Sequence, residues 1–225
     1  MDVLSTLCKI KKNIVFVQIG SNDADYGDPL REFILRYNWH GVMVEPVPYV
    51  FKRLQSKYGS RKGISLLNMA ISDTDNDKEF YYLAESTDSL PPWYDQLGSF
   101  YCENILKHRD YIPDIECRLR TMLVPCITLQ NLFKRYDIKQ LDVFHVDVEG
   151  YDYEIIRHLD IHNLRPTVVI YEHIHLLEWQ KMECESHLRN QSYYLFVQGS
   201  NTIALDVNKH QLIKHLSFIK ESNHA

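Results

Sequence analysis

Apolar runs alternate with amphipathic stretches along most of the chain, and this pattern predicts strands separated by helices. Buried strands are expected at 13–19, 41–46, 64–72, 141–150 and 167–175. Between them apolar residues recur at helical spacing, as with Leu30, Phe33, Ile34 and Tyr37 after the first strand. Repeated strand and helix units are typical of a parallel sheet covered by helices, so a doubly wound α/β fold is expected.

The end of the chain departs from this pattern. The runs "YYLFVQ" and "NTIALDV" are separated only by Gly199 and Ser200, a connection that suits an antiparallel hairpin. Such a hairpin would add antiparallel strands to one edge of the parallel sheet. Thr128 and Asp28 stand directly before helical patterns and are expected to cap them.

Residues 84–121 also break the rhythm, with two adjacent prolines and mixed charge. We interpret this stretch as an insertion in a single domain that spans 1–225. It contains five aromatic residues, Trp93, Tyr94, Phe100, Tyr101 and Tyr111. They would line a substrate pocket beneath a lid, together with His108 and Arg109, or fill a small satellite core. The sequence leaves both interpretations open.

Composition narrows the range of partners. The formal net charge of −5 gives no global positive field for nucleic acid or for an anionic membrane surface. The amino terminus does not resemble a signal peptide, and no apolar run approaches the roughly 20 residues that span a bilayer. Five scattered cysteines without a CxxC pair suggest free thiols. We therefore expect a cytoplasmic protein that binds neither nucleic acid nor membrane.

Ligands of open α/β sheets bind where the strands end. After the first strand, "GSNDADYGDPL" has only Gly20 in its first turn, where a dinucleotide loop needs three glycines. Asp23 and Asp25 would each repel a pyrophosphate, by roughly 4 kcal/mol at an effective dielectric near 20. The same carboxylates suit a cationic ligand. S-adenosylmethionine is such a ligand, because it is a nucleoside with a sulfonium and an ammonium group and no phosphate.

Glu45 ends the second strand. An acidic side chain at this position can accept hydrogen bonds from both ribose hydroxyls of a nucleoside. NAD enzymes use the same feature, and a solvated carboxylate at a strand end is the simpler alternative. Glu45 thus indicates a nucleoside without identifying it.

Six segments together resemble one known family. They are "VFVQIGSNDADYGDPL", "GVMVEPVPYVFKRL", "LLNMAISD", "PCITLQNLF", "LDVFHVDVEGYDYEII" and "YEHIHL". In this order, over about residues 14–206, they resemble the FkbM-type S-adenosylmethionine-dependent methyltransferases. The chain departs from the family pattern at Ser21, where alanine is usual, at Ala24, where glycine is usual, and at Asn201, where aspartate is usual.

The resemblance implies a class I methyltransferase fold. This is a Rossmann-like, mostly parallel, seven-stranded sheet with helices on both faces and a C-terminal antiparallel hairpin. It also implies methyl transfer, typically to a hydroxyl oxygen of a sugar, polyketide or other natural product. Ala24 would disfavour the positive φ that glycine adopts freely, so this substitution bears on the affinity for the cofactor.

The fourth strand carries the first catalytic candidates. Alternation along a strand would place His145, Asp147 and Glu149 on one face. Asp147 matches the acidic DxEG motif of the family, and it can contact the amino-acid end of the cofactor, hold a metal or act as a base. Glu149 can act beside it or cap the following helix. For His145 we prefer a buried histidine with satisfied hydrogen bonds.

On the fifth strand, alternation would place His173 and His175 on one face and Glu172 on the other. Methylation of a hydroxyl requires loss of its proton, and histidine suits a general base at neutral pH. We choose His173, which is nearest the strand end. Magnesium or manganese held by Asp147, Glu149 and His173 is an alternative that we do not favour, because the spacing matches no recognised metal cage.

The sequence thus predicts a methyltransferase acting on a small-molecule or glycan acceptor, with Asp147, Glu149 and His173 as catalytic residues and no resident metal. The cofactor-binding residues are expected to be Gly20, Ser21, Asn22, Asp23, Asp25, Glu45, Ala70, Ser72 and Asp147. Two alternatives are a methyltransferase fold that binds ligand without turnover, and a nucleotide-sugar oxidoreductase or epimerase. The missing glycines argue against the last of these.

Overall fold

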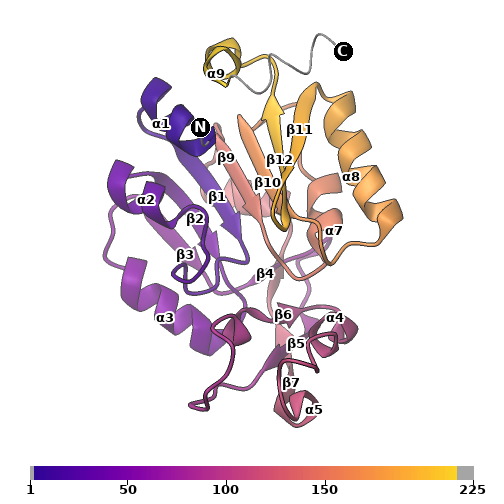
Figure 1. Cartoon of the computed structure of the whole chain (residues 1–225). Coiled ribbons are helices and arrows are strands. Elements are labelled where there is room, and N and C mark those ends of the chain that lie inside the picture. Colours follow the sequence, from indigo (N-terminus) through magenta and orange to yellow (C-terminus); the bar gives the residue numbers. More distant parts are fainter. Residues whose placement is uncertain (1–2, 217–225) are drawn as a thin grey trace.

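A mixed sheet forms the centre of the molecule in the computed structural model, which describes residues 3–216 (Figure 1). The ends of the expected 1–225 domain lie outside these residues. Within them, seven strands pair in the order β11-β12-β10-β9-β1-β2-β3. Their bounds are β1 Val15–Ile19, β2 His40–Val44, β3 Ile64–Leu67, β9 Val143–Val146, β10 Val168–Glu172, β11 Tyr193–Gln198 and β12 Asn201–Asp206.

Strand directions confirm the predicted fold class. Strands β3, β2, β1, β9 and β10 run parallel to one another, whereas β12 is antiparallel to both β10 and β11. The hairpin β11–β12 turns at Gly199 and Ser200, as expected from the sequence. This is the predicted parallel sheet with an antiparallel hairpin at its carboxyl-terminal edge.

Helices cover both faces of the sheet, and each group packs on its own apolar core (Figure 1). One face carries α1 Val3–Ile10, α2 Arg31–Tyr37, α3 Pro48–Tyr58 and α9 His210–His215. The other carries α6 Leu129–Arg135, α7 Asp152–Arg157 and α8 Glu178–Asn190. Strand β1 shows the alternation that separates the cores, because Val17 and Ile19 join one and Phe16 joins the other.

Thr128 caps its helix as predicted, whereas Asp28 binds the first N–H groups of its helix from two residues before the N-cap position, which Leu30 occupies. Thr128 accepts a hydrogen bond of 3.3 Å from the backbone N–H of Asn131 in α6. Asp28 accepts from the backbone N–H groups of Leu30 and Arg31, at 2.6 and 2.8 Å, and α2 begins at Arg31. Tyr37 does not face the sheet as its spacing predicted. It is 43% exposed, because α2 ends at this residue.

The strand expected at 64–72 is interrupted. Between β3 and β4 (Ala70–Ile71), the amide Nδ2 of Asn68 donates to the carbonyl oxygens of Glu45 and Pro46, at 2.8 and 2.9 Å. These bonds fasten the chain to the end of β2. It then leaves the main sheet, and β4 pairs instead with β8 (Cys126–Ile127).

Residues 78–124 build a second, antiparallel sheet in the order β6-β5-β7. Its elements are β5 Lys78–Leu83, the short helix η1 Tyr94–Gln96, β6 Gly98–Ser99, α4 Cys102–Leu106, α5 Ile115–Arg118 and β7 Leu119–Val124. In Figure 1 they lie below the carboxyl ends of the central strands. The sheet begins and ends outside the boundaries expected for the insertion, and we call residues 78–124 the insertion from here on.

The insertion has a small apolar core of its own. Tyr94, Leu97, Ile105 and Ile112 are buried in it, and Trp93 packs against it. A satellite core therefore accounts for two of the five aromatic residues. All five cysteines are free, as expected. None of the helices in residues 3–216 is both long and apolar enough to cross a membrane.

Candidate functional site

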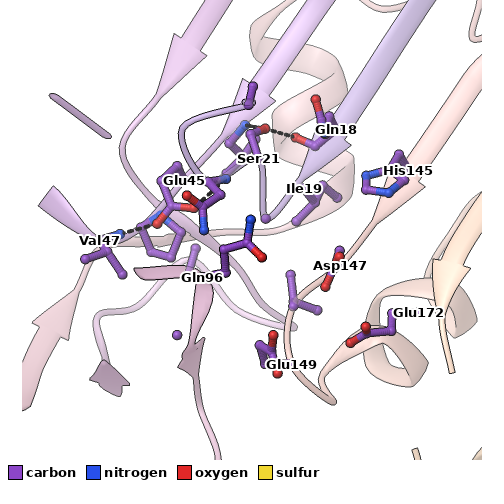
Figure 2. A pocket seen from close by; sticks show the side chains of 18 of the residues that line it. Gln18, Ile19, Ser21, Glu45, Val47, Gln96, His145, Asp147, Glu149 and Glu172 are labelled. Carbon is purple, nitrogen blue, oxygen red and sulfur yellow. Dashed lines mark hydrogen bonds between the residues drawn. The ribbon is translucent and has the colours of Figure 1, made fainter. Parts of the chain in front are cut away.

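A pocket opens where the parallel strands end, between the main sheet and the insertion (Figure 2). Counted out to its open mouth it encloses about 990 Å³, which accommodates a nucleoside-sized ligand. Figure 2 shows Glu45 on one side and Asp147, Glu149 and Glu172 on the other. From the insertion, Asp95, Gln96, Gly98 and Phe100 contribute to its wall.

Gly20 determines how closely two strand ends approach. Its φ is +74°, and a Cβ placed on it would lie 1.7 Å from the backbone oxygen of Asp147. Only glycine fits there. The N–H groups of Gly20 and Ser21 both donate to the carbonyl oxygen of Val44, at 3.0 and 2.9 Å. The loop after β1 therefore touches the loop after β9 and is fastened to β2.

Ser21 lines the pocket, but its hydroxyl is engaged inside the fold. It donates to the carbonyl oxygen of Gln18 at 3.1 Å and accepts from the N–H of Val44 at 3.2 Å. Of the residues after β4, Ala70 lines the pocket with Met69 and Ile71, whereas Ser72 does not. The Ser72 hydroxyl instead holds the turn that follows, through Asp73 and Thr74.

Glu45 is buried in the pocket wall and is fixed by two backbone donors. Its Oε2 accepts from the N–H of Asn22 at 2.9 Å, and its Oε1 accepts from the N–H of Val47 at 2.7 Å. Burial raises the pKa of Glu45 to about 7. Each carboxylate oxygen keeps a second lone pair for a ligand hydroxyl. The structure thus brings the predicted ribose-binding residue to the pocket in a fixed orientation.

Asp23 and Asp25 do not present free negative charge to the pocket. The ammonium of Lys57 lies 2.7 Å from Asp23 and 2.8 Å from Asp25, and Arg31 lies 3.0 Å from Asp25. The hydrogen bond from Lys57 holds the pKa of Asp25 below its usual value. Asp25 borders the pocket, but Asp23 does not. The expectation that these carboxylates select a cationic ligand is therefore wrong, because α2 and α3 supply their counter-ions.

Ala24 adopts the left-handed conformation that the family usually gives to glycine. Its φ is +51°, its side chain is only 1% exposed, and its carbonyl oxygen accepts from the hydroxyl of Tyr58 at 3.0 Å. The packed methyl group and this hydrogen bond hold a conformation that alanine rarely adopts. The loop therefore keeps its shape despite the substitution.

Three carboxylates meet at the far side of the pocket. One oxygen each from Asp147, Glu149 and Glu172 lies within 4.8 Å of the other two. Burial raises the pKa of all three; repulsion from Asp28 adds to the effect on Asp147, and repulsion from other members of the cluster adds to it on Glu149 and Glu172. Two unit charges at this distance repel by roughly 3 to 4 kcal/mol at an effective dielectric near 20. Without a cation they cannot all be ionised at neutral pH.

Strand alternation does not produce this cluster. Strand β9 ends at Val146, and Glu149 follows in a turn with φ of +53°. Its side chain points into the pocket, and α7 has no side-chain cap hydrogen bond, so Glu149 does not cap this helix. Glu172, expected on the opposite face from the catalytic histidine, is instead part of the cluster.

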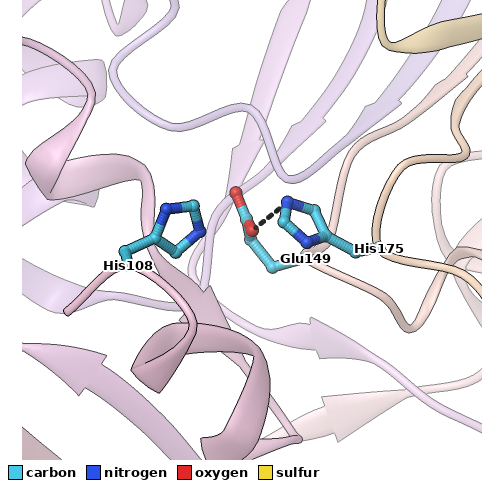
Figure 3. Close-up of side chains that lie close together, drawn as sticks. All are labelled: His108, Glu149 and His175. Carbon is cyan, nitrogen blue, oxygen red and sulfur yellow. Dashed lines mark ion pairs between the residues drawn. The ribbon is translucent and has the colours of Figure 1, made fainter. Parts of the chain in front are cut away.

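His173 does not reach the pocket. Strand β10 ends at Glu172, so His173 and His175 lie beyond the alternating part. The Nδ1 atom of His173 lies 3.1 Å from the hydroxyl oxygen of Thr202, against the C-terminal hairpin. His175 lies closer to the carboxylates, although it does not line the pocket either. Its Nε2 lies 3.1 Å from Glu149 Oε2 (Figure 3) and 3.6 Å from Glu172 Oε2.

The insertion contacts the strand-end loops on two sides of the pocket. Gln96 donates to the carbonyl oxygen of Tyr26 at 2.8 Å, and Ser99 donates to that of Glu149 at 2.8 Å. His108 lies beside His175, with ring centroids 5.7 Å apart. Arg109 turns back to the carbonyl of Leu106 and does not line the pocket.

Among the five aromatics of residues 84–121, Phe100 alone lines the pocket, where Phe80 of β5 also lies. Tyr101 is 39% exposed beside Tyr151, and Tyr111 is 69% exposed. The satellite-core interpretation therefore holds for Trp93 and Tyr94, whereas Phe100 and polar groups of the segment border the pocket.

His145 is buried in the pocket wall, but its hydrogen bonds are not satisfied. Neither ring nitrogen has a partner among residues 3–216, and burial lowers its pKa to about 4. Nearby, Gln18 donates to Asp28 at 2.7 Å, so Asp28 combines its capping role with a place in the pocket. His145 is thus buried as expected, but its ring nitrogens lack the hydrogen bonds that were also expected.

Sequence patterns missed Gln18 and Glu172 as residues that line the pocket. Gln18 has the one usable signal, a polar residue inside an otherwise apolar strand. His108, expected from the sequence to line the pocket with the aromatic residues, instead lies beside His175 and Glu149 and does not line it.

Comparisons with known proteins identify the family and the fold of the chain. A family model described as "Methyltransferase FkbM domain" matches residues 18–197. No curated protein matches the chain. A crystal structure of a methyltransferase FkbM from Methylobacillus flagellatus KT is similar, with a TM-score of 0.51 and 11% identity. The match covers 86% of this chain and 43% of that one, so the chain spans less than half the length of that protein.

Two further solved structures resemble the chain more weakly. A precorrin-6y C5,15-methyltransferase from Geobacter metallireducens GS-15 has a TM-score of 0.43 at 13% identity, with 90% of this chain and 86% of that chain covered. The N-terminal domain of human METTL16 has a TM-score of 0.46 at 12% identity, with 90% and 65% covered. At these identities the likeness concerns the fold alone.

Proposed function

Because the chain belongs to the FkbM family of methyltransferase domains, we propose that it transfers a methyl group from S-adenosylmethionine to a hydroxyl oxygen. The acceptor we propose is a sugar, a glycan or a natural-product small molecule. S-adenosylmethionine supplies an electrophilic methyl group on a sulfonium. The observation that carries the proposal is the position of Glu45, buried in the pocket at the end of β2 with both oxygens oriented by backbone donors.

The residues around the pocket suit such a cofactor. Glu45 would accept the two ribose hydroxyls, and the apolar wall at Met69 and Ile71 would take the base. Gly20 leaves room for the ligand at the end of β1. Asp147 stands next to it and would receive the ammonium of the amino-acid end, since no lysine or arginine in residues 3–216 forms an ion pair with it.

The acceptor would enter beside Glu149, Glu172 and His175. Burial lowers the pKa of His175 to about 4, so the imidazole is neutral at pH 7, and it would take up a proton only with the help of a neighbouring ionised carboxylate. Glu149, 3.1 Å from its Nε2, would stabilise the imidazolium that forms. As the oxygen–carbon bond forms and the carbon–sulfur bond breaks, the hydroxyl proton passes to this Glu149–His175 pair. His175 thus takes the role that the sequence assigned to His173.

Calorimetric titration with S-adenosylhomocysteine tests the cofactor half of the proposal. We expect saturable binding, weakened about tenfold or more by Glu45→Ala, because ribose hydroxyls lose a charged acceptor. Glu32→Ala removes an exposed carboxylate on α2 and serves as the matched control. Absence of binding at millimolar ligand would refute the assignment of the cofactor.

A screen of hydroxyl-bearing acceptors with methyl-labelled cofactor tests the transfer itself. We expect label in an ether product of a sugar or a natural-product alcohol. Binding of S-adenosylhomocysteine without transfer to any acceptor would favour the alternative of a fold that binds the cofactor and does not turn over.

A further inference from the structure

Three possible metal ligands converge from three separate segments. His108 comes from the insertion, Glu149 from the loop after β9 and His175 from the loop after β10 (Figure 3). One ligand atom of each lies within 4.8 Å of the others. Glu149 Oε2 and His175 Nε2 are 3.1 Å apart without the geometry of a hydrogen bond. Glu172 stands next to them, with its Oε2 3.6 Å from the same His175 nitrogen.

Several atoms of this group are buried without a partner. His108 Nε2, Glu149 Oε2 and Glu172 Oε2 are inaccessible to solvent, and none has a hydrogen-bond partner among the described residues. Glu172 as a whole is only 8% exposed. Buried polar atoms are nearly always paired, so a group of unpaired ones needs an explanation, and a bound ion is one. All three atoms belong to residues that can ligate a cation.

Charge gives an independent argument. Asp147, Glu149 and Glu172 place three carboxylates together, and no lysine or arginine in residues 3–216 forms an ion pair with them. The charge of Lys107 acts on Glu149, but its ammonium donates to Asn104 Oδ1 at 2.7 Å. The three carboxylates therefore have no lysine or arginine paired with them among the described residues, and a divalent cation would supply that charge.

From these observations we propose that His108, Glu149 and His175 form a binding site for a divalent transition-metal ion, with Glu172 beside it. Two imidazoles and a carboxylate are a donor set that suits zinc, which also leaves an open position. Magnesium prefers oxygen ligands, so this set disfavours it. The site differs from the combination of Asp147, Glu149 and His173 considered from the sequence, because His173 is turned toward Thr202.

The spacing of the three ligand atoms is compatible with one tetrahedral ion. Ligand atoms around a tetrahedral zinc ion stand about 3.3 Å apart, given bonds of about 2.0 to 2.1 Å. The Glu149–His175 pair already has nearly this separation, and the ligand atom of His108 lies within 4.8 Å of both. Small side-chain movements would therefore bring all three atoms to bonding distance from one ion. Granting the proposed function, the open position would take the acceptor hydroxyl and lower its pKa, and with metal bound this would replace proton transfer to the Glu149–His175 pair.

Metal binding is measured on the full chain, dialysed against a chelator and titrated with zinc chloride by calorimetry. We expect a single equivalent to bind, with about tenfold or greater weakening in both His108→Ala and His175→Ala. His40→Ala, which removes an exposed histidine at the start of β2, is the control and should leave affinity unchanged. No saturable binding, or equal binding in all four proteins, would overturn the site.

Two further measurements guard against unfolded variants. His108→Gln and Glu149→Gln keep the size of each side chain, and zinc should raise the Tm of the unmodified chain but of neither variant. Cobalt should give visible absorption bands in the unmodified chain and lose them in both variants; bands that persist would overturn the site. Titration of the metal-free protein with S-adenosylhomocysteine measures cofactor binding on its own. A negative result there would count against the proposed function, and a negative zinc titration would count against the metal site.

Discussion

The amide Nδ2 of Asn104 donates a hydrogen bond of 2.7 Å to the carbonyl oxygen of Glu149, which lies 45 residues further along the chain. The contact is tight, since a Cβ placed on Gly150 would lie 2.1 Å from the same nitrogen. Ser99 donates to the same oxygen at 2.8 Å. The insertion therefore holds Glu149 in its left-handed turn, and the shape of the acidic cluster depends on a segment remote in sequence.

Asn104→Ala should separate turnover from cofactor binding. Loss of one donor to a buried carbonyl should lower the free energy of unfolding by about 1 kcal/mol. Glu149 would no longer be held in place, so turnover should fall about tenfold or more. Affinity for S-adenosylhomocysteine should change by less than about twofold, because Gly20 and Glu45 make no contact with Asn104. Urea denaturation, kinetics and calorimetry measure the three quantities.

The control for this variant is Asn190→Ala, which removes an exposed amide at the end of α8. It should leave all three quantities unchanged. Equal losses of affinity and turnover in Asn104→Ala would contradict a role confined to Glu149.

Gly20→Ala should be severely destabilising. The new Cβ would overlap the backbone of Asp147, and the φ of +74° is unfavourable for alanine. We expect a loss of more than about 3 kcal/mol in the free energy of unfolding, together with loss of cofactor binding. Gly199→Ala is the matched comparison, because φ is +61° and nothing lies within 4 Å of the added Cβ. It should cost only about 1 kcal/mol, and similar costs for the two would show that steric overlap is unimportant.

Substitutions of Ala24 test whether the altered loop is strained. Ala24→Gly relieves the left-handed φ by about 1 to 2 kcal/mol but removes a buried methyl group worth about 0.8 kcal/mol and adds freedom to the unfolded chain. The free energy of unfolding should change by less than about 1 kcal/mol, and cofactor affinity by less than about twofold. Ala24→Val should cost more than about 2 kcal/mol, because a β-branched residue resists positive φ. A large gain of affinity in Ala24→Gly would mean that alanine impairs the pocket.

Cofactor binding should depend on pH through Glu45. Its folded pKa of about 7 lies above the ordinary 4.5, so the folded state keeps a proton that the unfolded state releases. The contribution of Glu45 to stability therefore falls as pH rises from 4.5 to 7 and stays low above that range. Ribose hydroxyls donate best to the ionised form, so affinity for S-adenosylhomocysteine should be roughly tenfold higher at about pH 8 than at about pH 6. Glu45→Gln should remove this pH dependence of the affinity. If the pH dependence persists in the variant, another titrating group causes it.

Asp147→Asn should abolish turnover while sparing the fold. The variant removes one of three carboxylates that repel one another, and the pKa of Asp147 is raised by burial. A raised folded pKa means that its ionisation opposes folding as pH increases, so the Tm at neutral pH should be equal or higher. Turnover should fall about a hundredfold or more, whereas the exposed substitution Asp137→Asn should change neither quantity. An active, well-folded Asp147→Asn protein would remove this residue from the site.

The sequence by itself determined the fold class and the order of the central strands along the chain. Hydrophobic periodicity follows from which face of a strand or helix is buried, and neighbouring residues carry that information. The hairpin at Gly199, the cap at Thr128 and the strand-end positions of Glu45 and Asp147 are local features of this kind. For the same reason the resemblance to the family could be stated from short segments in order.

Only the tertiary structure decided which residues form the site and which of their charges are neutralised by other residues. Lys57 neutralises Asp23 and Asp25 from another helix, and His108 arrives on the insertion, so neither contact has a signature in the neighbouring sequence. Alternation failed for His173 because β10 ends one residue before it, and beyond that point the turn sets the direction of each side chain. The alternation of side chains along a strand holds only as far as the backbone hydrogen bonds of the sheet extend. The polar residues of this pocket lie in the loops just after the strands end, where that alternation no longer applies.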